Sequence, residues 1–89
     1  MEYLRPWYAD DSDALIAELR RELVSGHPLF GVSVSALARR EDRDDALFAI
    51  HDGTRRVAVA HLTWKKETDP AWPETTIFES LEVWANGAM

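Results

Sequence analysis

The sequence feature that most constrains the fold is a pair of apolar runs on either side of Asp52-Gly53. Residues 45–51 (DALFAIH) precede this dipeptide and residues 55–64 (RRVAVAHLTW) follow it. Asp-Gly between two such runs is a strong signal for an antiparallel hairpin, because both turn residues tolerate a positive φ. The sequence therefore predicts a hairpin on which the rest of the chain packs.

A helix is expected on each side of the predicted strands. The segment 12–25 follows the acidic run 10–13, which offers N-cap candidates and suits the positive end of a helix dipole. Gly26 and Pro28 then end the helix. Its apolar residues recur at a helical period: Leu15, Ile16, Leu19, Leu23 and Val24. A last helix, capped by Ser80, has a similar stripe: Leu81, Trp84, Ala85 and Ala88.

Two further segments complete the predicted sheet. Residues 34–41 combine alternating apolar positions with strong helix formers, so a strand is favoured and a short helix over 34–40 is the alternative. Residues 74–78 (ETTIF) have the β-branched and aromatic content of a short strand. The connections are too short for parallel crossovers. We expect one α+β domain over residues 1–89, an antiparallel meander of three to four strands with both helices packed on one face.

The hairpin determines which side chains become neighbours. If Asp52-Gly53 alone forms the loop, Asp44 lies opposite His61, whereas a four-residue loop places Asp44 diagonal to it. In both registers the helix-covered face carries the same four apolar residues: Phe48, Ile50, Val57 and Val59. The opposite face is also apolar, so we expect a homodimer that covers it.

The pair of His61 and Asp44 is the candidate for acid–base catalysis, because a carboxylate can orient an imidazole for proton transfer. The alternative is a structural pair at a strand end, which is the commoner role for such residues. No serine or threonine is tied to this pair by a motif, so the sequence does not support a catalytic triad.

Trp64 and Trp72 are candidate partner or ligand contacts, together with Leu62. Pro70 and Pro73 flank Trp72, and tryptophan in a proline-bearing loop gives a rigid apolar surface for a peptide or small molecule. The alternative is that both indole rings cover a small core, and we expect them to be mostly buried.

Several classes of function find no support in the sequence. The chain has no cysteine, its histidines are not at metal-binding spacings, and its glycines match no phosphate-binding loop, so neither a metal nor a cofactor is expected. Ten basic residues against sixteen acidic ones give a net charge of −6, which disfavours nucleic acid. No segment resembles a membrane span or a secretion signal, so a cytoplasmic location is expected.

Several segments together resemble a small bacterial protein family of unassigned function with an AVVHLTW-like strand. They are HPLFG, ALARREDRDDALF, DG, VAVAHLTW, WP and IFESLEVW, within residues 23–85. The resemblance implies a bacterial cytoplasmic protein and favours a strand over 34–41. It brings no catalytic residues with it.

Two functional hypotheses follow from these observations. The first is a small acidic protein-binding or regulatory module, of which an immunity-like antagonist of a basic toxin is one form. The second is a small enzyme that uses the pair of His61 and Asp44 for acid–base chemistry. The first is favoured because no motif marks a reaction.

Overall fold

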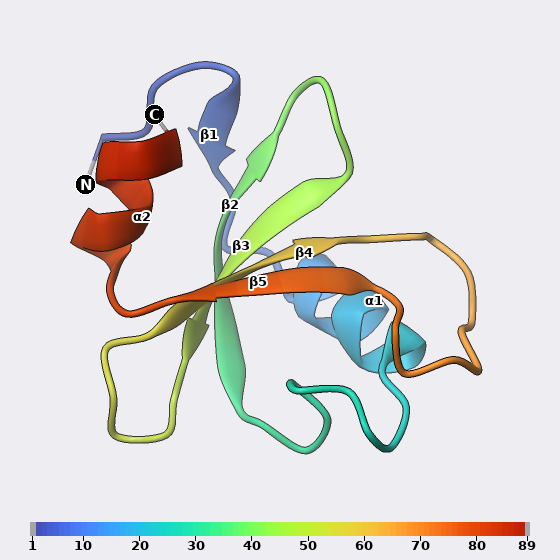
Figure 1. Ribbon diagram of the computed structural model, residues 1–89. Helices are drawn as coiled ribbons and strands as arrows, with labels where there is room; N and C mark the ends of the chain where they lie inside the picture. The colour runs from blue at the N-terminus through green and yellow to red at the C-terminus, as the bar shows by residue number, and fades with distance from the viewer. Residues whose placement is uncertain (1, 89) are drawn as a thin grey trace.

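The protein is built on one antiparallel sheet, whose five strands pair in sequence order in the computed structural model (Figure 1). The structure describes residues 2–88, apart from the side chain of Ala88. The elements are β1 (Trp7–Ala9), α1 (Asp13–Glu22), β2 (Val34–Arg40), β3 (Asp45–Ile50), β4 (Val57–His61), β5 (Glu74–Phe78) and α2 (Leu81–Ala88). The α+β class and the antiparallel meander are thus confirmed.

The sheet has one strand more than the three to four predicted. The additional strand is β1, which pairs antiparallel with β2 and places Trp7 opposite Arg40. Three residues are too few to show an alternating pattern, so this strand has no signal of its own in the sequence. The segment with conflicting signals is a strand, β2, and not the alternative helix.

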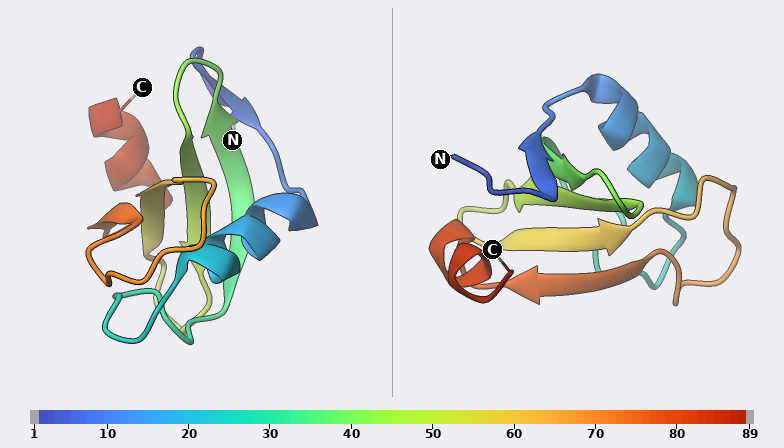
Figure 2. Two further views of the ribbon diagram at one scale, coloured as in Figure 1. Left: turned by 90° about the vertical axis from the view of Figure 1, so that its right-hand side faces the viewer. Right: turned by 90° about the horizontal axis from the view of Figure 1, so that it is seen from above.

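The two helices cover opposite faces of the sheet, so the prediction that both pack on one face is wrong (Figure 2). On one face, Leu15 and Leu19 of α1 pack in a cluster with Phe48. On the other, Trp84 of α2 packs in a cluster with Leu47. Adjacent residues of a strand point to opposite faces, and here both sets are apolar enough to need cover.

The β3–β4 register differs by one residue from each predicted register. Asp45 lies opposite His61, and Ala49 lies opposite Val57. The loop is longer than Asp52-Gly53, because Ile50 N–H donates to the Arg56 carbonyl at 3.1 Å. A one-residue shift moves a strand's whole apolar set to the other face. Phe48 therefore shares its face with Ala58 and Ala60 instead of Val57 and Val59.

The second apolar face of the sheet is closed by the chain itself. Leu47 and Val57 are buried beneath α2, and the ring of Trp84 meets that of Trp7 edge-on at 5.0 Å. The uncovered face on which the predicted homodimer depended is therefore largely filled. The homodimer stays a prediction without that support.

Candidate functional site

The part of this second face that α2 leaves open carries a row of polar side chains. The cross-strand partners of His61 are Asp45 on β3 and Glu74 on β5. Residues directly opposite each other in a sheet point to the same face, so two carboxyl side chains flank the imidazole. We call Asp45, His61 and Glu74 the acidic row.

The predicted partnership of His61 with Asp44 is corrected by this register. His61 Nδ1 lies 2.7 Å from Asp45 Oδ1, while the Asp44 carbonyl accepts a hydrogen bond from Leu62 N–H at 3.0 Å. A carboxylate only accepts, so Nδ1 donates and Nε2 is the basic atom of a neutral ring. The side chain of His61 is 48% exposed, and this basic atom belongs to a solvent-facing group.

A polar pocket of about 300 Å³ surrounds the acidic row. Arg43, Val59 and Thr76 complete its lining. Two carboxyl groups and one imidazole thus share the pocket with a single arginine side chain. No cluster of histidine and carboxylate side chains with a geometry suited to a metal ion occurs within residues 2–88. Carboxyl and imidazole groups of this kind are chemically suited to contacts with cationic groups and to proton transfer.

A second pocket of about 390 Å³ adjoins the first through His61. We call it the Trp72 pocket; its lining is Asp44, His61, Leu62, Thr63, Lys65, Glu67 and Trp72. Leu62, a predicted contact, is a buried core residue that forms part of this lining. Glu67 is also buried, and within residues 2–88 its Oε2 has no hydrogen-bond partner.

The two tryptophans of the predicted groove are more exposed than expected and occupy different surroundings. Trp64 and Trp72 are each 43% exposed, so neither is a fully buried core residue. The guanidinium of Arg39 lies 5.7 Å from the centre of the Trp64 ring, whereas Trp72 lines the pocket beside His61. Trp64 is not part of that lining.

The start of the β4–β5 loop is held by Glu22, a residue that the sequence analysis did not single out. Its Oε1 accepts hydrogen bonds from Thr63 N–H at 2.7 Å and Thr63 Oγ1 at 3.0 Å, and its Oε2 accepts one from Trp64 N–H at 2.9 Å. Glu22 is fully buried and lies on the apolar stripe of α1, seven positions after Leu15. A glutamate among the apolar residues of this stripe was the sequence signal that could have identified it as a buried, hydrogen-bonded residue.

Burial raises the pKa of Glu22, and nearby Glu18 acts in the same direction, while the hydrogen bonds from Thr63 and Trp64 lower it. Trp64 has a positive φ of 59°, a conformation uncommon outside glycine. The Glu22 carboxylate accepts from the two backbone N–H groups that lead into this bend, those of Thr63 and Trp64. Glu22 is therefore a structural support for the loop that forms the Trp72 pocket.

The other two histidines lie outside the two adjoining pockets. His27 is buried, accepts from Leu29 N–H through Nδ1 at 3.0 Å, and donates from Nε2 to the Pro73 carbonyl at 2.8 Å. It thus fastens the segment before β5. His51 is exposed and its Nε2 contacts the hydroxyl of Ser35.

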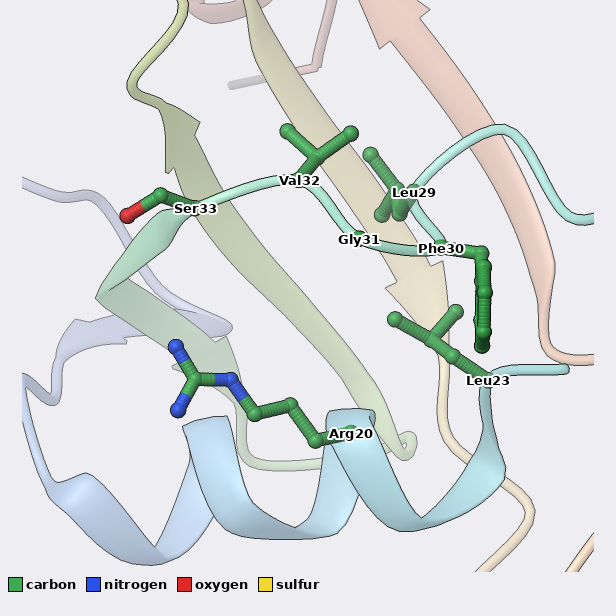
Figure 3. Close-up of a pocket in the computed structure, with 7 residues that line it drawn as sticks. All are labelled: Arg20, Leu23, Leu29, Phe30, Gly31, Val32 and Ser33. Carbon is green, nitrogen blue, oxygen red and sulfur yellow. The ribbon is translucent and has the colours of Figure 1, made fainter. Parts of the chain in front are cut away.

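A third pocket, of about 380 Å³, lies between α1 and the segment that leads into β2 (Figure 3). Leu23 and Phe30 lie beside each other at one side, and Arg20 rises from α1 (Figure 3). The remaining lining is small or apolar: Leu29, Gly31, Val32 and Ser33. With one charged group, this pocket brings no catalytic groups together.

No helix within residues 2–88 has the length and apolar character that crossing a bilayer requires. No family model, curated protein or solved structure matches the chain. The family resemblance and the bacterial origin that it implies therefore stay predictions, and the functional argument depends on the geometry of the two adjoining pockets.

Proposed function

We propose that the chain is a small acidic protein-binding module that recognises a basic protein. The acidic row carries this proposal: two carboxyl side chains flank a half-exposed imidazole on the part of the sheet that α2 does not cover. One form of this function is an immunity-like antagonist of a basic toxin, and a regulatory subunit is another.

The charge of the chain supports a basic partner. A net charge of −6 on 89 residues attracts cationic surfaces, and complementary charge raises the rate of association and selects the partner. The two adjoining pockets hold four carboxyl side chains, namely Asp44, Asp45, Glu67 and Glu74. Only Arg43 and Lys65 oppose them there.

An exposed aromatic side chain at the edge of this acidic surface adds the second property of a protein-binding site. Interface energy is concentrated in a few aromatic or arginine side chains, surrounded by polar contacts. Trp72 is half-exposed and lies in a turn, where its backbone N–H donates to the Asp69 carbonyl at 3.0 Å. It can therefore serve as a preorganised anchor beside the charged groups.

The test compares capture by the wild type and by the double variant D45N/E74Q in lysate of the native host. The captured protein is identified, purified and titrated against both forms. We expect a basic protein whose affinity falls about tenfold in the variant, roughly threefold for each carboxylate removed. Added salt should also weaken its binding to the wild type, because salt screens the attraction between the charges.

The charge-matched control is D11N/E82Q. Asp11 precedes α1 and Glu82 lies in the first turn of α2, and both are exposed and away from the two pockets. This variant should keep the wild-type affinity to within about twofold. A captured protein that binds D45N/E74Q as well as the wild type contradicts the proposal.

The hydrogen bond of 2.7 Å between His61 and Asp45 favours a second candidate, an acid–base enzyme. In that case Nε2 of His61 is the proton acceptor and Asp45 keeps the ring oriented. A panel of chromogenic esters, amides and phosphate esters tests it. Saturable turnover by the wild type that disappears in H61Q, with the unfolding midpoint unchanged, would favour the enzyme. If the wild type turns over none of these substrates, the enzyme hypothesis loses its support and the binding function remains.

A further inference from the structure

The Trp72 pocket contains a buried acceptor for which residues 2–88 provide no donor. Glu67 is 8% exposed, and its Oε2 has no hydrogen-bond partner among these residues. The nearest cation is Lys65 Nζ at 3.9 Å, beyond hydrogen-bond distance, on a lysine side chain that is 73% exposed. A buried carboxylate oxygen without a donor is costly, so an observed one indicates a missing partner.

The remaining lining of the pocket suits a cation with a flat apolar surface. Trp72 provides an accessible aromatic ring, Asp44 a second carboxylate and Leu62 an apolar side chain. Cations bind over the face of an indole ring by attraction to its quadrupole. The volume of about 390 Å³ is at the small end of the range for ligand pockets, which is about 300–1,000 Å³.

Two other tryptophans of the chain already have such a partner. The guanidinium of Arg39 lies 5.7 Å from the centre of the Trp64 ring, and that of Arg40 lies 5.8 Å from the centre of the Trp7 ring. Among residues 2–88, no cation lies over Trp72 in this way. Trp72 is thus a half-exposed indole beside an unsatisfied carboxylate, with no guanidinium of its own.

We propose that the Trp72 pocket receives an arginine side chain of the basic partner, whose guanidinium stacks on Trp72 and donates to Glu67; this inference rests on the proposed function. Arginine fits better than lysine because its planar guanidinium has five donors, stacks on aromatic rings and is weakly hydrated. Asp44, an exposed residue of the lining, adds a second acceptor. Lys65 moves aside when the guanidinium enters, since the two compete for Glu67.

The test uses a peptide probe and does not require the partner. The protein labelled with ¹⁵N is titrated with acetyl-Gly-Arg-Gly-amide, followed through the indole N–H signal of Trp72 and the backbone signals of residues 62–73. We expect saturable shifts with a dissociation constant on the order of millimolar, as for a single anchoring residue. The lysine peptide should bind at least threefold more weakly, and the citrulline peptide should give no saturable shift.

Two substitutions and their controls identify the groups that bind. E67Q should weaken the arginine peptide at least tenfold and W72L about threefold, whereas W64L should not change its affinity. K65M removes the competitor, so binding should tighten by about threefold. K66M makes the same change in net charge outside the pocket and should tighten binding less.

Equal affinity for the arginine, lysine and citrulline peptides overturns the inference, as do shifts outside the pocket or no saturable shift. The capture experiment separates this failure from that of the proposed function. A basic partner that depends on Asp45 and Glu74, combined with no peptide binding, rejects only the arginine pocket. Specific peptide binding without any such partner rejects the protein-binding function and keeps the pocket as an arginine site.

Discussion

Two buried glutamates, Glu22 at the end of α1 and Glu67 in the β4–β5 loop, stand in opposite relations to that loop. Glu22 receives three hydrogen bonds from Thr63 and Trp64, where the loop leaves β4. Glu67, four residues after Thr63 in that loop, has a buried Oε2 with no hydrogen-bond partner in the described part of the chain. The first carboxylate holds the start of the loop, and the second lines the Trp72 pocket.

The difference between them shows how a buried charge can be assigned to folding or to binding. A carboxylate satisfied by backbone donors of its own chain stabilises a particular conformation, here the bend at Trp64. A carboxylate that burial has stripped of water without giving it donors destabilises the free protein. In the complex proposed above, a guanidinium of the partner supplies the donor that Glu67 lacks.

The same substitution at the two sites gives the largest expected contrast. Glu22→Met removes three hydrogen bonds and leaves the N–H groups of Thr63 and Trp64 without their acceptor. We expect the free energy of unfolding to fall by about 3 kcal/mol, measured by urea denaturation. Glu79→Met is the control, because Glu79 is exposed and makes none of these bonds, so the change should cost under about 1 kcal/mol. A loss at Glu22 no larger than this control would contradict the structural role.

Glu67→Met should act in the opposite direction. Methionine has a similar volume and no group that needs a donor, so replacing the unsatisfied carboxylate is expected to stabilise the free protein by about 1 kcal/mol. The same urea experiment measures it, with Glu79→Met as an exposed control. If Glu67→Met destabilises by 1 kcal/mol or more, Glu67 is satisfied within the fold and the contrast with Glu22 is lost.

The pairing of His61 with Asp45 is expected to give a smaller effect. His61 is half-exposed, and solvent screens such a pair, so the coupling free energy should be about 0.5 kcal/mol. A double-mutant cycle with D45N and H61Q measures it from four unfolding free energies. The parallel cycle with D44N should give a coupling near zero. A larger coupling to Asp44 than to Asp45 would show that the β3–β4 register is wrong.

The strands and helices themselves were largely predictable because each carries a local signal. The alternating run after Asp52-Gly53 and the stripe of α1 gave β4 and α1. The register was not predictable, because it depends on a loop stabilised by side chains. Asp52 accepts hydrogen bonds from Thr54 N–H at 3.0 Å and from Arg56 at 2.6 Å, and these bonds fix a loop longer than two residues.

The site was predictable only in part. His61 and Trp72 stood out by type and position, but their partners Asp45 and Glu67 depend on register and on the path of the loop. The face of the sheet that α2 covers could not be predicted either, because both faces of the hairpin are apolar. Which helix covers which face depends on how the whole chain packs, and no single residue of the sequence indicates it.

Asp52 provides the last and smallest test, since it is a carboxylate satisfied by its own loop but exposed to solvent. Hydrogen bonds from Thr54, and then from Arg56, lower the pKa of Asp52 from 3.8 to about 2. Because the folded pKa lies below the unfolded one, the stabilisation is present above about pH 4 and is lost as the pH falls through about 2. The difference in unfolding midpoint between wild type and D52N should therefore be constant above about pH 5 and shrink toward pH 2. In the R56M background the same step should be smaller, because the hydrogen bond and the charge of Arg56 no longer lower the pKa of Asp52. A difference that does not change with pH would mean that the charge of Asp52 contributes nothing to this loop.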